Sequence, residues 1–451
     1  MGVSLGSLRS RIKERSVVEA IRSGRFAGKA YLVGGAVREL CLGREPNDFD
    51  IVLSRQEDLG TLEELLGSCA FALGKKPIQT CRIVKKDLSV DITFLSSSIE
   101  DDLARRDFTM NAVAYDIHGD EIIDVLGGIE DIEKRMIRCP SKGALLDDPL
   151  RMLKAIRHFS VIKGFVIQDD LEQSIGELKT LINRPAPERI KYEMDQVLIA
   201  ENSFDGLKLM EKTGLLFQIF PELEALQKMD LEKKFTLGTY GHTIDGFKFL
   251  RTYGELYDLD EKDLKDVGYA LLFHDFGKAH TFSYDEQKRL VHFFYHERVS
   301  NEIASLVMER LRFSSHEIST IHKLIENHMR IFLVSNADST EKALKRLVYK
   351  IEGLTPSLIV HTMCDMYGSS GGQENSSTER VKKKCDELME CYSDWKKKPL
   401  PRVVDGYDLI NLGFKEGPQL GQVLAEIRER QISGEITERD EAIRYATSLL
   451  S

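Results

Sequence analysis

Two aspartates one residue apart are the first candidates for chemistry in this chain. They lie in Asn47-Asp48-Phe49-Asp50-Ile51, which continues into an apolar run. Side chains alternate between the two faces of a β-strand, so Asp48 and Asp50 would share one face. Neighbouring carboxylates repel each other unless cations lie between them, and two Mg²⁺ ions about 4 Å apart are the common arrangement in phosphate-transfer sites. A turn aspartate followed by a strand-entry aspartate is the alternative.

A third carboxylate and a glycine pair could complete such a site. Asp91 lies in Val90-Asp91-Ile92-Thr93-Phe94, where it faces away from its apolar neighbours if the segment is a strand. Gly34 and Gly35 follow an apolar strand and precede a helix start. Glycine lets the backbone approach a phosphate, and free N–H groups at a helix start attract anions. A glycine pair alone is weak evidence, because turns use it often.

Histidines and aspartates in the second half of the chain form another candidate cluster. His274 and Asp275 end an apolar helical segment, and the other members lie at separate helical positions: His242, His296, His328 and Asp365. Imidazoles and carboxylates on facing helices build metal sites for hydrolysis. Each histidine by itself is more often structural or exposed than a ligand.

The elements that must position these residues predict an α+β fold. Residues 1 to about 28 are predicted as one amphipathic helix, and short β-rich runs follow at 31–33, 49–53, 78–84, 90–95 and 112–117. This pattern indicates a head with one mixed sheet. After Pro140 strand patterns almost vanish, and a Gly/Ser-rich linker is predicted at 368–378. We predict four domains: a head at 1–138, an all-α neck and body at 139–230, an all-α metal domain at 231–370, and a linker with a helical tail at 371–451.

Composition narrows the class of protein. The net charge of −10 argues against a nucleic-acid partner, but residues 133–163 carry eight Lys and Arg against three acids. That segment is either an RNA-facing surface or a solvated helix face. The absence of any long apolar run predicts no membrane partner, and seven scattered cysteines without a C-x-x-C pair favour reduced thiols in the cytoplasm.

Four linked segments resemble the class II nucleotidyltransferase family of bacterial tRNA CCA-adding enzymes and poly(A) polymerases. They are LVGGAVRELCLGREPNDFDIV (32–52), DDLARRDFTMNAVAYD (101–116), DDPLRMLKAIRHF (147–159) and APERIKYEM (186–194). The resemblance implies that Asp48 and Asp50 hold catalytic Mg²⁺ and that Asp91 completes the site. It also implies phosphate and ribose contacts from Gly34, Gly35, Arg38, Arg105, Arg106 and Asp107, and recognition of the incoming base by Asp148 and Arg151.

Two departures from the family pattern bear on nucleotide choice. Asp147 stands where the family usually has Glu. The loop between the third carboxylate and the Arg-Arg-Asp motif is also shortened to residues 95–102. In the family this loop helps to switch from cytosine to adenine, so its loss favours an enzyme that adds only two cytosines. Asp148 and Arg151, three apart on a predicted helix, would share a face; an intrahelical ion pair is the alternative.

The second cluster resembles the HD phosphohydrolase superfamily. His274-Asp275-Phe276-Gly277-Lys278 fits its core motif, and the outer ligands would be His242, His296, His328 and Asp365. The resemblance implies a helical domain with one or two divalent transition metals (Ni, Mn, Co or Fe) and phosphodiesterase or phosphatase activity. The remaining candidates match no motif: His280, His292, His316, His322 and His361.

Taken together, these resemblances predict a tRNA 3′-terminal nucleotidyltransferase that uses CTP, with ATP as a further substrate, and releases pyrophosphate. If it adds only CC, a separate A-adding enzyme is implied as a partner. A poly(A) polymerase is the alternative within the class. A metal phosphohydrolase acting on nucleotides or RNA ends, with a head that only binds RNA, is the alternative of another class.

Overall fold

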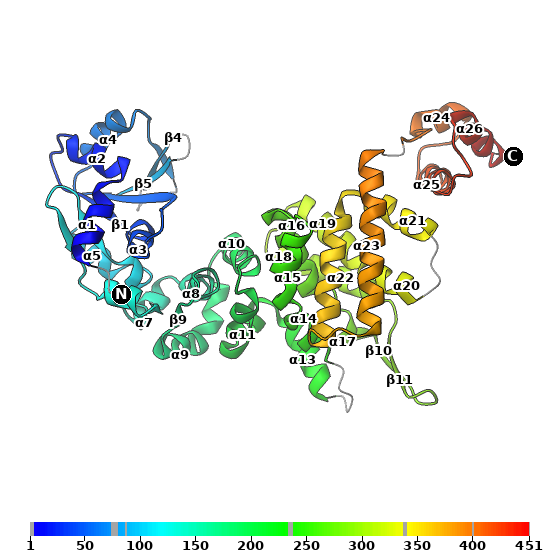
Figure 1. The fold of residues 1–451 in the computed structure, drawn as a ribbon, viewed down its shortest axis with the longest axis horizontal. Helices are drawn as coiled ribbons and strands as arrows, with labels where there is room; N and C mark the ends of the chain where they lie inside the picture. Colours follow the sequence, from blue (N-terminus) through cyan, green and yellow to red (C-terminus); the bar gives the residue numbers. More distant parts are fainter. Residues whose placement is uncertain are drawn as a thin grey trace. The chain divides into compact units, whose positions relative to one another are not determined.

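The computed structural model describes residues 4–73, 80–85, 88–232, 238–336, 341–398 and 401–450. The chain divides into two compact units. The first comprises Met1–Val197 and Leu209–Ile219, and the second comprises Leu198–Lys208 and Phe220–Ser451. Strands dominate the N-terminal part of the first unit, whereas the second is built almost wholly from helices (Figure 1). This arrangement confirms the predicted fold class.

One seven-stranded mixed sheet forms the head of the first unit, in the order β3-β4-β5-β2-β1-β6-β7. β2 and β5 run parallel, and the other neighbours run antiparallel. Burial alternates over the first four residues of β2, as the period of two predicts, and the strand is then buried on both faces to its end at Leu53. Residues 78 and 79 of the predicted run 78–84 lie outside the described residues. The strands are β1 (Ala30–Val33), β2 (Asp48–Leu53), β3 (Phe71–Leu73), β4 (Thr80–Lys85), β5 (Leu88–Phe94), β6 (Ala114–Asp116) and β7 (Glu121–Ile123).

Short helices accompany the sheet. The prediction of one helix over residues 1–28 is wrong, because the chain breaks at Arg15, which is extended, and forms two helices. The break allows Leu8 and Ile12 of the first helix to be buried together with Val17 and Ile21 of the second. The helices are α1 (Leu5–Lys13), α2 (Ser16–Ser23), α3 (Gly35–Cys41), α4 (Asp58–Leu66), α5 (Ile99–Ala104), η1 (Thr109–Asn111) and α6 (Gly128–Glu133).

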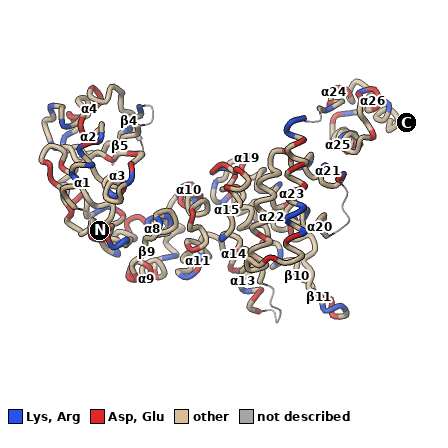
Figure 2. The backbone as a smooth tube through the Cα atoms, viewed as in Figure 1, with Lys and Arg blue, Asp and Glu red and all other residues tan. Residues whose placement is uncertain are grey.

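Helices follow the sheet in the chain. α8 buries Met152, Leu153 and Ile156, and basic residues recur along its sequence (Figure 2). A short parallel pair, β8 (Met136–Ile137) with β9 (Val166–Ile167), was not predicted. The helices are α7 (Lys142–Asp147), α8 (Leu150–Val161), α9 (Asp169–Leu178), η2 (Lys179–Asn183), α10 (Pro187–Leu198), α11 (Ser203–Thr213) and α12 (Leu215–Ile219).

The second unit packs around two helices that are buried along most of their length, α16 and α22. An antiparallel hairpin of β10 (Phe282–Asp285) and β11 (Leu290–Phe293) adds to the predicted helices. The helices are α13 (Pro221–Glu232), α14 (Thr239–Asp245), α15 (Phe247–Leu256), α16 (Glu261–Phe273), α17 (Lys278–Thr281), α18 (His296–Arg310), α19 (Ser315–Asn327), α20 (Arg330–Asn336), α21 (Glu341–Ile351), η3 (Glu352–Leu354), α22 (Thr355–Ser370) and α23 (Ser376–Lys397).

The predicted linker at 368–378 is mostly helical, so that prediction is wrong. α22 continues to Ser370, and α23 begins at Ser376 with Asn375 as its N-cap. Gly371 ends α22 in the left-handed conformation at φ 62°. Helices therefore face each other across a short turn at this point.

The C-terminal residues form the small helical tail that was predicted. It consists of α24 (Gly406–Leu412), α25 (Pro418–Ile432) and α26 (Arg439–Ser448). These helices share a cluster of buried residues that includes Leu409, Ile427 and Ala442. Among the described helices of the whole chain, none is long and apolar enough to cross a lipid bilayer.

Two candidate active sites

The sheet brings the three predicted carboxylates of the head together. Asp48 and Asp50 lie on the same face of β2, and Asp50 is the direct partner of Asp91 across the parallel β2–β5 pair. Burial raises the pKa of Asp50, and Asp91 and Asp48 raise it further, while Arg106 lowers it. The three carboxylates therefore interact electrostatically, and a cation bound between them would relieve their mutual repulsion.

Gly34 lies directly beside this cluster, between β1 and α3. Its φ is +74°, and a Cβ at this position would stand 2.6 Å from Oδ2 of Asp50 and 3.2 Å from Nη1 of Arg106. Both the conformation and the space favour glycine alone. Gly35 begins α3. The turn therefore places backbone next to the carboxylates, as the sequence predicted.

Arginines of the predicted phosphate-binding set are held by protein partners. Arg38 donates to Oδ1 of Asn111 at 2.6 Å and to Oε1 of Glu39 at 2.8 Å. Arg106 donates to Asp102 at 3.0 Å, whereas the side chain of Arg105 is largely exposed.

Asp107 lies within a polar network. Its Oδ1 accepts from the side chain of Asn111 at 3.0 Å, and its Oδ2 lies 3.8 Å from Nζ of Lys154 on α8. The Arg-Arg-Asp motif therefore joins the sheet region to the helix that follows it.

Asp148 and Arg151 are close in the chain but do not share a helix, so that expectation is wrong. Asp148 is extended and caps the end of α7, and Arg151 lies in the first turn of α8. Pro149 separates them, because proline favours the N-terminal boundary of a helix. Oδ2 of Asp148 accepts from Arg189 at 2.8 Å, and Arg151 donates to the carbonyl of Arg105 at 2.7 Å. The alternative of an ion pair between Asp148 and Arg151 is not formed.

Two arginines at the head site were missed from the sequence. Arg189 lies in the segment APERIKYEM, which was recognised without assigning this residue a role. Arg82 on β4 donates two hydrogen bonds to Asp91, at 2.6 and 2.7 Å. Alternation along residues 80–85 would have placed Arg82 on one face, but its partner depends on strand register.

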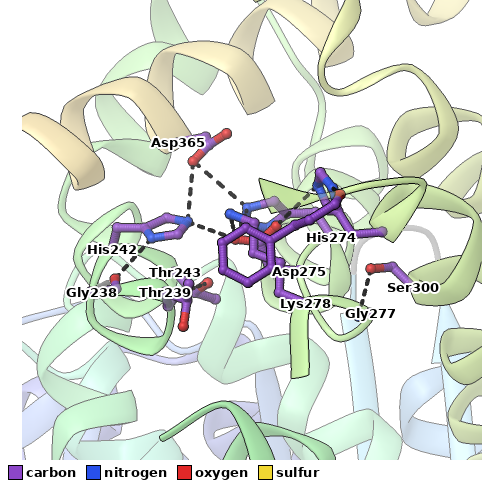
Figure 3. Close-up of polar contacts among 12 residues, drawn as sticks. Gly238, Thr239, His242, Thr243, His274, Asp275, Gly277, Lys278, Ser300 and Asp365 are labelled. Carbon is purple, nitrogen blue, oxygen red and sulfur yellow. Dashed lines mark hydrogen bonds and ion pairs between the residues drawn. The ribbon is translucent and has the colours of Figure 1, made fainter. Parts of the chain in front are cut away.

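The histidine and aspartate cluster of the second unit is assembled from five helical segments (Figure 3). Nε2 of His242 lies 2.9 Å from Oδ2 of Asp275 and 3.5 Å from Oδ1 of Asp365. Nε2 of His274 lies 3.3 Å from Oδ2 of Asp275, and Nε2 of His296 lies 3.5 Å from Oδ1 of the same residue. The structure thus brings together the residues that the sequence selected.

Backbone carbonyls fix the orientation of all four histidines. In each ring Nδ1 lies within hydrogen-bond distance of a carbonyl oxygen three or four residues earlier. A carbonyl only accepts, so Nδ1 carries the hydrogen and Nε2 of the neutral ring offers a lone pair to the cluster. This is the usual arrangement of metal-binding histidines. The contacts are His242 with Gly238 (2.9 Å), His274 with Leu271 (2.8 Å), His296 with Phe293 (2.9 Å) and His328 with Ile325 (2.6 Å).

The resulting lone pairs require a positive charge between them. Nε2 of His296 and Nε2 of His328 are 3.1 Å apart, and with both Nδ1 atoms protonated neither neutral ring can donate to the other. Two overlapping sets of atoms are close enough to hold an ion: His242, His274 and Asp365, and His274, Asp275 and His328. Nitrogen and carboxylate ligands of this kind fit a divalent transition metal.

Electrostatics of the cluster agree with that fit. Burial lowers the pKa of His296 and, more strongly, that of His328, so these rings are neutral as ligands must be. His274 differs from these two rings: burial lowers its pKa, but Asp275 and Asp365 outweigh burial and raise it to about 10, so a metal binding here would have to displace a proton from its Nε2. Burial opposes ionisation of Asp275, but the charges of His274 and Lys278 outweigh it and hold the pKa of that carboxyl well below its usual range. Nζ of Lys278 lies 2.6 Å from Oδ2 of Asp275.

His361 is a member of the cluster that the sequence did not identify. It is fully buried on α22, one turn before Asp365, and its ring centroid lies 5.2 Å from that of His274 and 5.9 Å from that of His328. Its spacing of four residues from Asp365 was the available signal, because such residues share a helix face. Among the described residues, neither His361 nor the other unassigned histidines belong to the two ion-holding sets.

Comparison with known proteins finds similarity over the regions that carry the two candidate sites. Three family models match: the Poly A polymerase head domain at residues 30–97 and 75–138, the probable RNA and SrmB-binding site of polymerase A at 164–227, and the HD domain at 239–386. The chain is 29% identical over 422 residues to a CC-adding tRNA nucleotidyltransferase of Thermus thermophilus, covering 92% of each chain. It is 27% identical over 424 residues to an A-adding tRNA nucleotidyltransferase of Deinococcus radiodurans, covering 92% of this chain and 94% of that one.

A solved structure shares the fold. It is the CCA-adding enzyme of Bacillus stearothermophilus in complex with CTP, with a TM-score of 0.65, 21% identity and 98% of each chain covered. At that identity the likeness concerns the fold alone.

Proposed function

We propose that this chain adds cytidine residues to the 3′ end of tRNA. It is a nucleotidyltransferase of the family that contains the poly(A) polymerases and the tRNA CCA-adding enzymes, with an HD domain behind the head. The RNA 3′-hydroxyl oxygen would bond to the α-phosphorus of CTP as the bond to pyrophosphate breaks. No template strand takes part. The observation that carries the proposal is the pairing of Asp50 on β2 with Asp91 on β5, with Asp48 on the same face of β2, beside a glycine that leaves no room for a side chain.

The head residues would divide the work as follows. Nucleotidyltransferase domains generally use divalent cations, and Mg²⁺ held by Asp48 and Asp50 would activate the 3′-hydroxyl and steady the triphosphate. Asp91 would complete the carboxylate set. Phosphate and ribose would be gripped by a wider set of residues: Gly34, Gly35, Arg38, Arg105, Arg106 and Asp107.

Asp148 and Arg151 would recognise the edge of the incoming base. A carboxylate accepts and a guanidinium donates, which suits the edge of cytosine. In the described structure each already has a protein partner, Arg189 for Asp148 and the Arg105 carbonyl for Arg151. These contacts would keep the two side chains extended toward the base before it arrives.

Addition of two cytosines is supported by the short connection after the third carboxylate. β5 ends at Phe94 and α5 begins at Ile99, with Ser98 as its N-cap. Only residues 95–98 lie between them, which is too short for a mobile loop of about a dozen residues. A separate enzyme would then add the terminal adenosine.

The test is single-nucleotide-resolution incorporation on tRNA that ends at the discriminator base, with Mg²⁺ and with CTP, ATP or both. We expect a stop after two cytosines that ATP does not change. Three additions ending in A would contradict the CC assignment, and a long A tail on any RNA would identify a poly(A) polymerase. Turnover that survives Asp48→Ala plus Asp50→Ala would contradict the head as the catalytic site.

A second candidate function is metal-dependent hydrolysis of phosphate esters by the HD domain. HD domains generally use divalent metals, and Ni, Mn, Co or Fe suits the imidazole-rich set of this chain. The supporting observation is that four imidazoles, three of them buried, hold Nδ1 against backbone carbonyls, and that ligand atoms of two overlapping His and Asp sets lie close together.

The hydrolytic activity is tested with bis(p-nitrophenyl) phosphate and p-nitrophenyl phosphate on metal-loaded protein. Hydrolysis lost in Asp365→Asn but retained in Asp48→Ala plus Asp50→Ala would assign it to the HD domain. Failure of every one of these metals to produce hydrolysis would contradict the assignment.

A further inference from the structure

Arg82 lies at the head site but has no role in the proposed reaction. It lies on β4 as the antiparallel partner of Asp91 on β5, and Asp91 is in turn the partner of Asp50 on β2. Paired residues of neighbouring strands point to the same face of a sheet. Asp50, Asp91 and Arg82 therefore form a row across three strands, with the guanidinium at the end of the row.

The contact between Arg82 and Asp91 uses both oxygens of the carboxylate. Nε donates to Oδ1 at 2.6 Å and Nη2 donates to Oδ2 at 2.7 Å. This bidentate geometry is the strong form of an arginine–carboxylate pair. The hydrogen bond to Asp91 raises the pKa of Arg82, and the charges of Asp48 and Asp50 add to the same effect. Arg82 thus lies in the field of all three carboxylates.

The contact between Arg82 and Asp91 would be weakened when Asp91 binds a cation or accepts a proton. A divalent cation needs a carboxylate oxygen at about 2.1 Å, and acceptance of a proton also needs a free oxygen. Both oxygens of Asp91 accept a hydrogen bond from Arg82, and a guanidinium beside a dication is repelled. Arg82 and a divalent cation therefore compete for Asp91.

We propose that Arg82 is a positioning residue that acts as the internal counter-cation of Asp91, and that it competes with a divalent cation for this carboxylate. Before a cation binds, Arg82 offsets part of the negative charge of the carboxylate row and keeps Asp91 aligned with Asp50. It thereby lowers the affinity of the head for free divalent cation. The inference rests on the proposed nucleotidyl transfer, because it assumes that the carboxylates hold the catalytic cation.

The sign of the change in cation affinity tests this role. Removing a positive charge that competes for Asp91 tightens cation binding, whereas removing a merely orienting partner loosens it. Mn²⁺ binding to the full-length protein without nucleotide is followed by the electron paramagnetic resonance of free Mn²⁺. The head component is the part lost in Asp48→Ala plus Asp50→Ala, which separates it from binding at the HD domain.

We expect Arg82→Ala to bind Mn²⁺ in the head on the order of threefold to tenfold more tightly than the wild type. Arg82→Lys keeps the charge and should stay near the wild-type affinity. Lys85→Ala is the matched control, because it removes a positive charge from the same strand, from a side chain that contacts the Leu66 carbonyl instead of a carboxylate. If Arg82→Ala does not fold, Arg82→Gln provides the same test.

An unchanged or weaker affinity in Arg82→Ala or Arg82→Gln overturns the proposal, even if the wild type incorporates cytidine. The same is true if Lys85→Ala tightens binding equally. Activity supplies a second measurement: Arg82→Ala should need less Mg²⁺ for half-maximal cytidine incorporation, and a higher Mg²⁺ requirement would also overturn the proposal. Absence of any cytidine incorporation by the wild type would instead contradict the proposed function, and the Mn²⁺ comparison distinguishes the two failures.

Discussion

The two candidate sites hold their carboxylates in opposite surroundings. On the sheet of the head, Asp48 is exposed and Asp50 and Asp91 are half-buried, whereas Asp275 in the helical unit is 1% exposed. Arginines balance the charge of the head, and imidazoles with backbone-anchored Nδ1 atoms surround the buried cluster. Low polarity around the buried cluster strengthens every ion–ligand attraction.

This difference indicates two ways of using a cation. An open carboxylate row suits a cation that arrives with the nucleotide, because RNA and triphosphate must reach it. A buried set with fixed tautomers suits a resident ion, because its ligands are positioned before the ion binds. The predictions below test whether the two sites are independent and whether this contrast holds.

The largest expected effect comes from removing the carboxylate pair of the head. Asp48→Ala plus Asp50→Ala should lower cytidine incorporation by about 10³-fold or more, because the catalytic cation loses its ligands. Hydrolysis of bis(p-nitrophenyl) phosphate should be unchanged. Glu57→Ala, an exposed acid shortly after β2, is the control and should keep both activities. Equal loss of hydrolysis would show that the two sites are coupled.

The next effect is expected at the helical cluster. His328→Ala removes one member of the 3.1 Å Nε2 pair and should weaken metal binding by about 10²-fold, with hydrolysis lost in proportion. Metal content after dialysis and hydrolysis rate are the measurements. His316→Ala on α19, the helix that His328 ends, should leave both unchanged. Metal retained by His328→Ala would exclude this residue from the ligand set.

The helical unit also contains a buried carboxylate outside the cluster, which can be compared with the paired carboxylates of the cluster. Asp266 on α16 is 1% exposed, and neither carboxylate oxygen has a hydrogen-bond partner among the described residues. Burial raises its pKa from 3.8 to about 7. The folded state therefore binds the proton more tightly than the unfolded state. The contribution of Asp266 to stability is then most favourable below pH 3.8, falls as the pH rises from 3.8 to 7, and stays low above that.

Asp266→Asn should accordingly raise the free energy of unfolding by about 2 kcal/mol at pH 8 and change it little at pH 4. Chemical denaturation at both pH values measures this. Asp263→Asn, on the same helix and also with a raised pKa but less buried, is the comparison and should show a smaller gain. An equal increase in the free energy of unfolding at pH 4 would mean that better packing, and not removal of the buried charge, stabilises the variant.

The smallest effect concerns base recognition. Arg189→Ala frees Asp148 from its 2.8 Å contact and should raise the KM for CTP severalfold while kcat changes less, because the side chain loses its orientation. Arg189→Lys should restore part of the affinity. Single-nucleotide incorporation at varied CTP concentration measures both constants. A large fall in kcat with constant KM would place Arg189 in the chemical step.

Much of the head site could be predicted from local pattern. A strand period of two places Asp48 and Asp50 on one face, and glycine at position 34 anticipates a conformation with φ of +74°. The histidines of the second site stand in helical segments whose apolar spacing is visible along the chain. These features depend on neighbours within a few residues, so the sequence determined them by itself.

The partners of those residues were decided only by the tertiary structure. Arg82 meets Asp91 through strand register, and Asp148 meets Arg189 from 41 positions away. His361 joins the cluster because α22 packs against the other helices there. Proline at 149 separates Asp148 from the helix that carries Arg151. Such contacts depend on which elements pair and at what offset, and that choice is made by burial of the whole core, which no local spacing encodes.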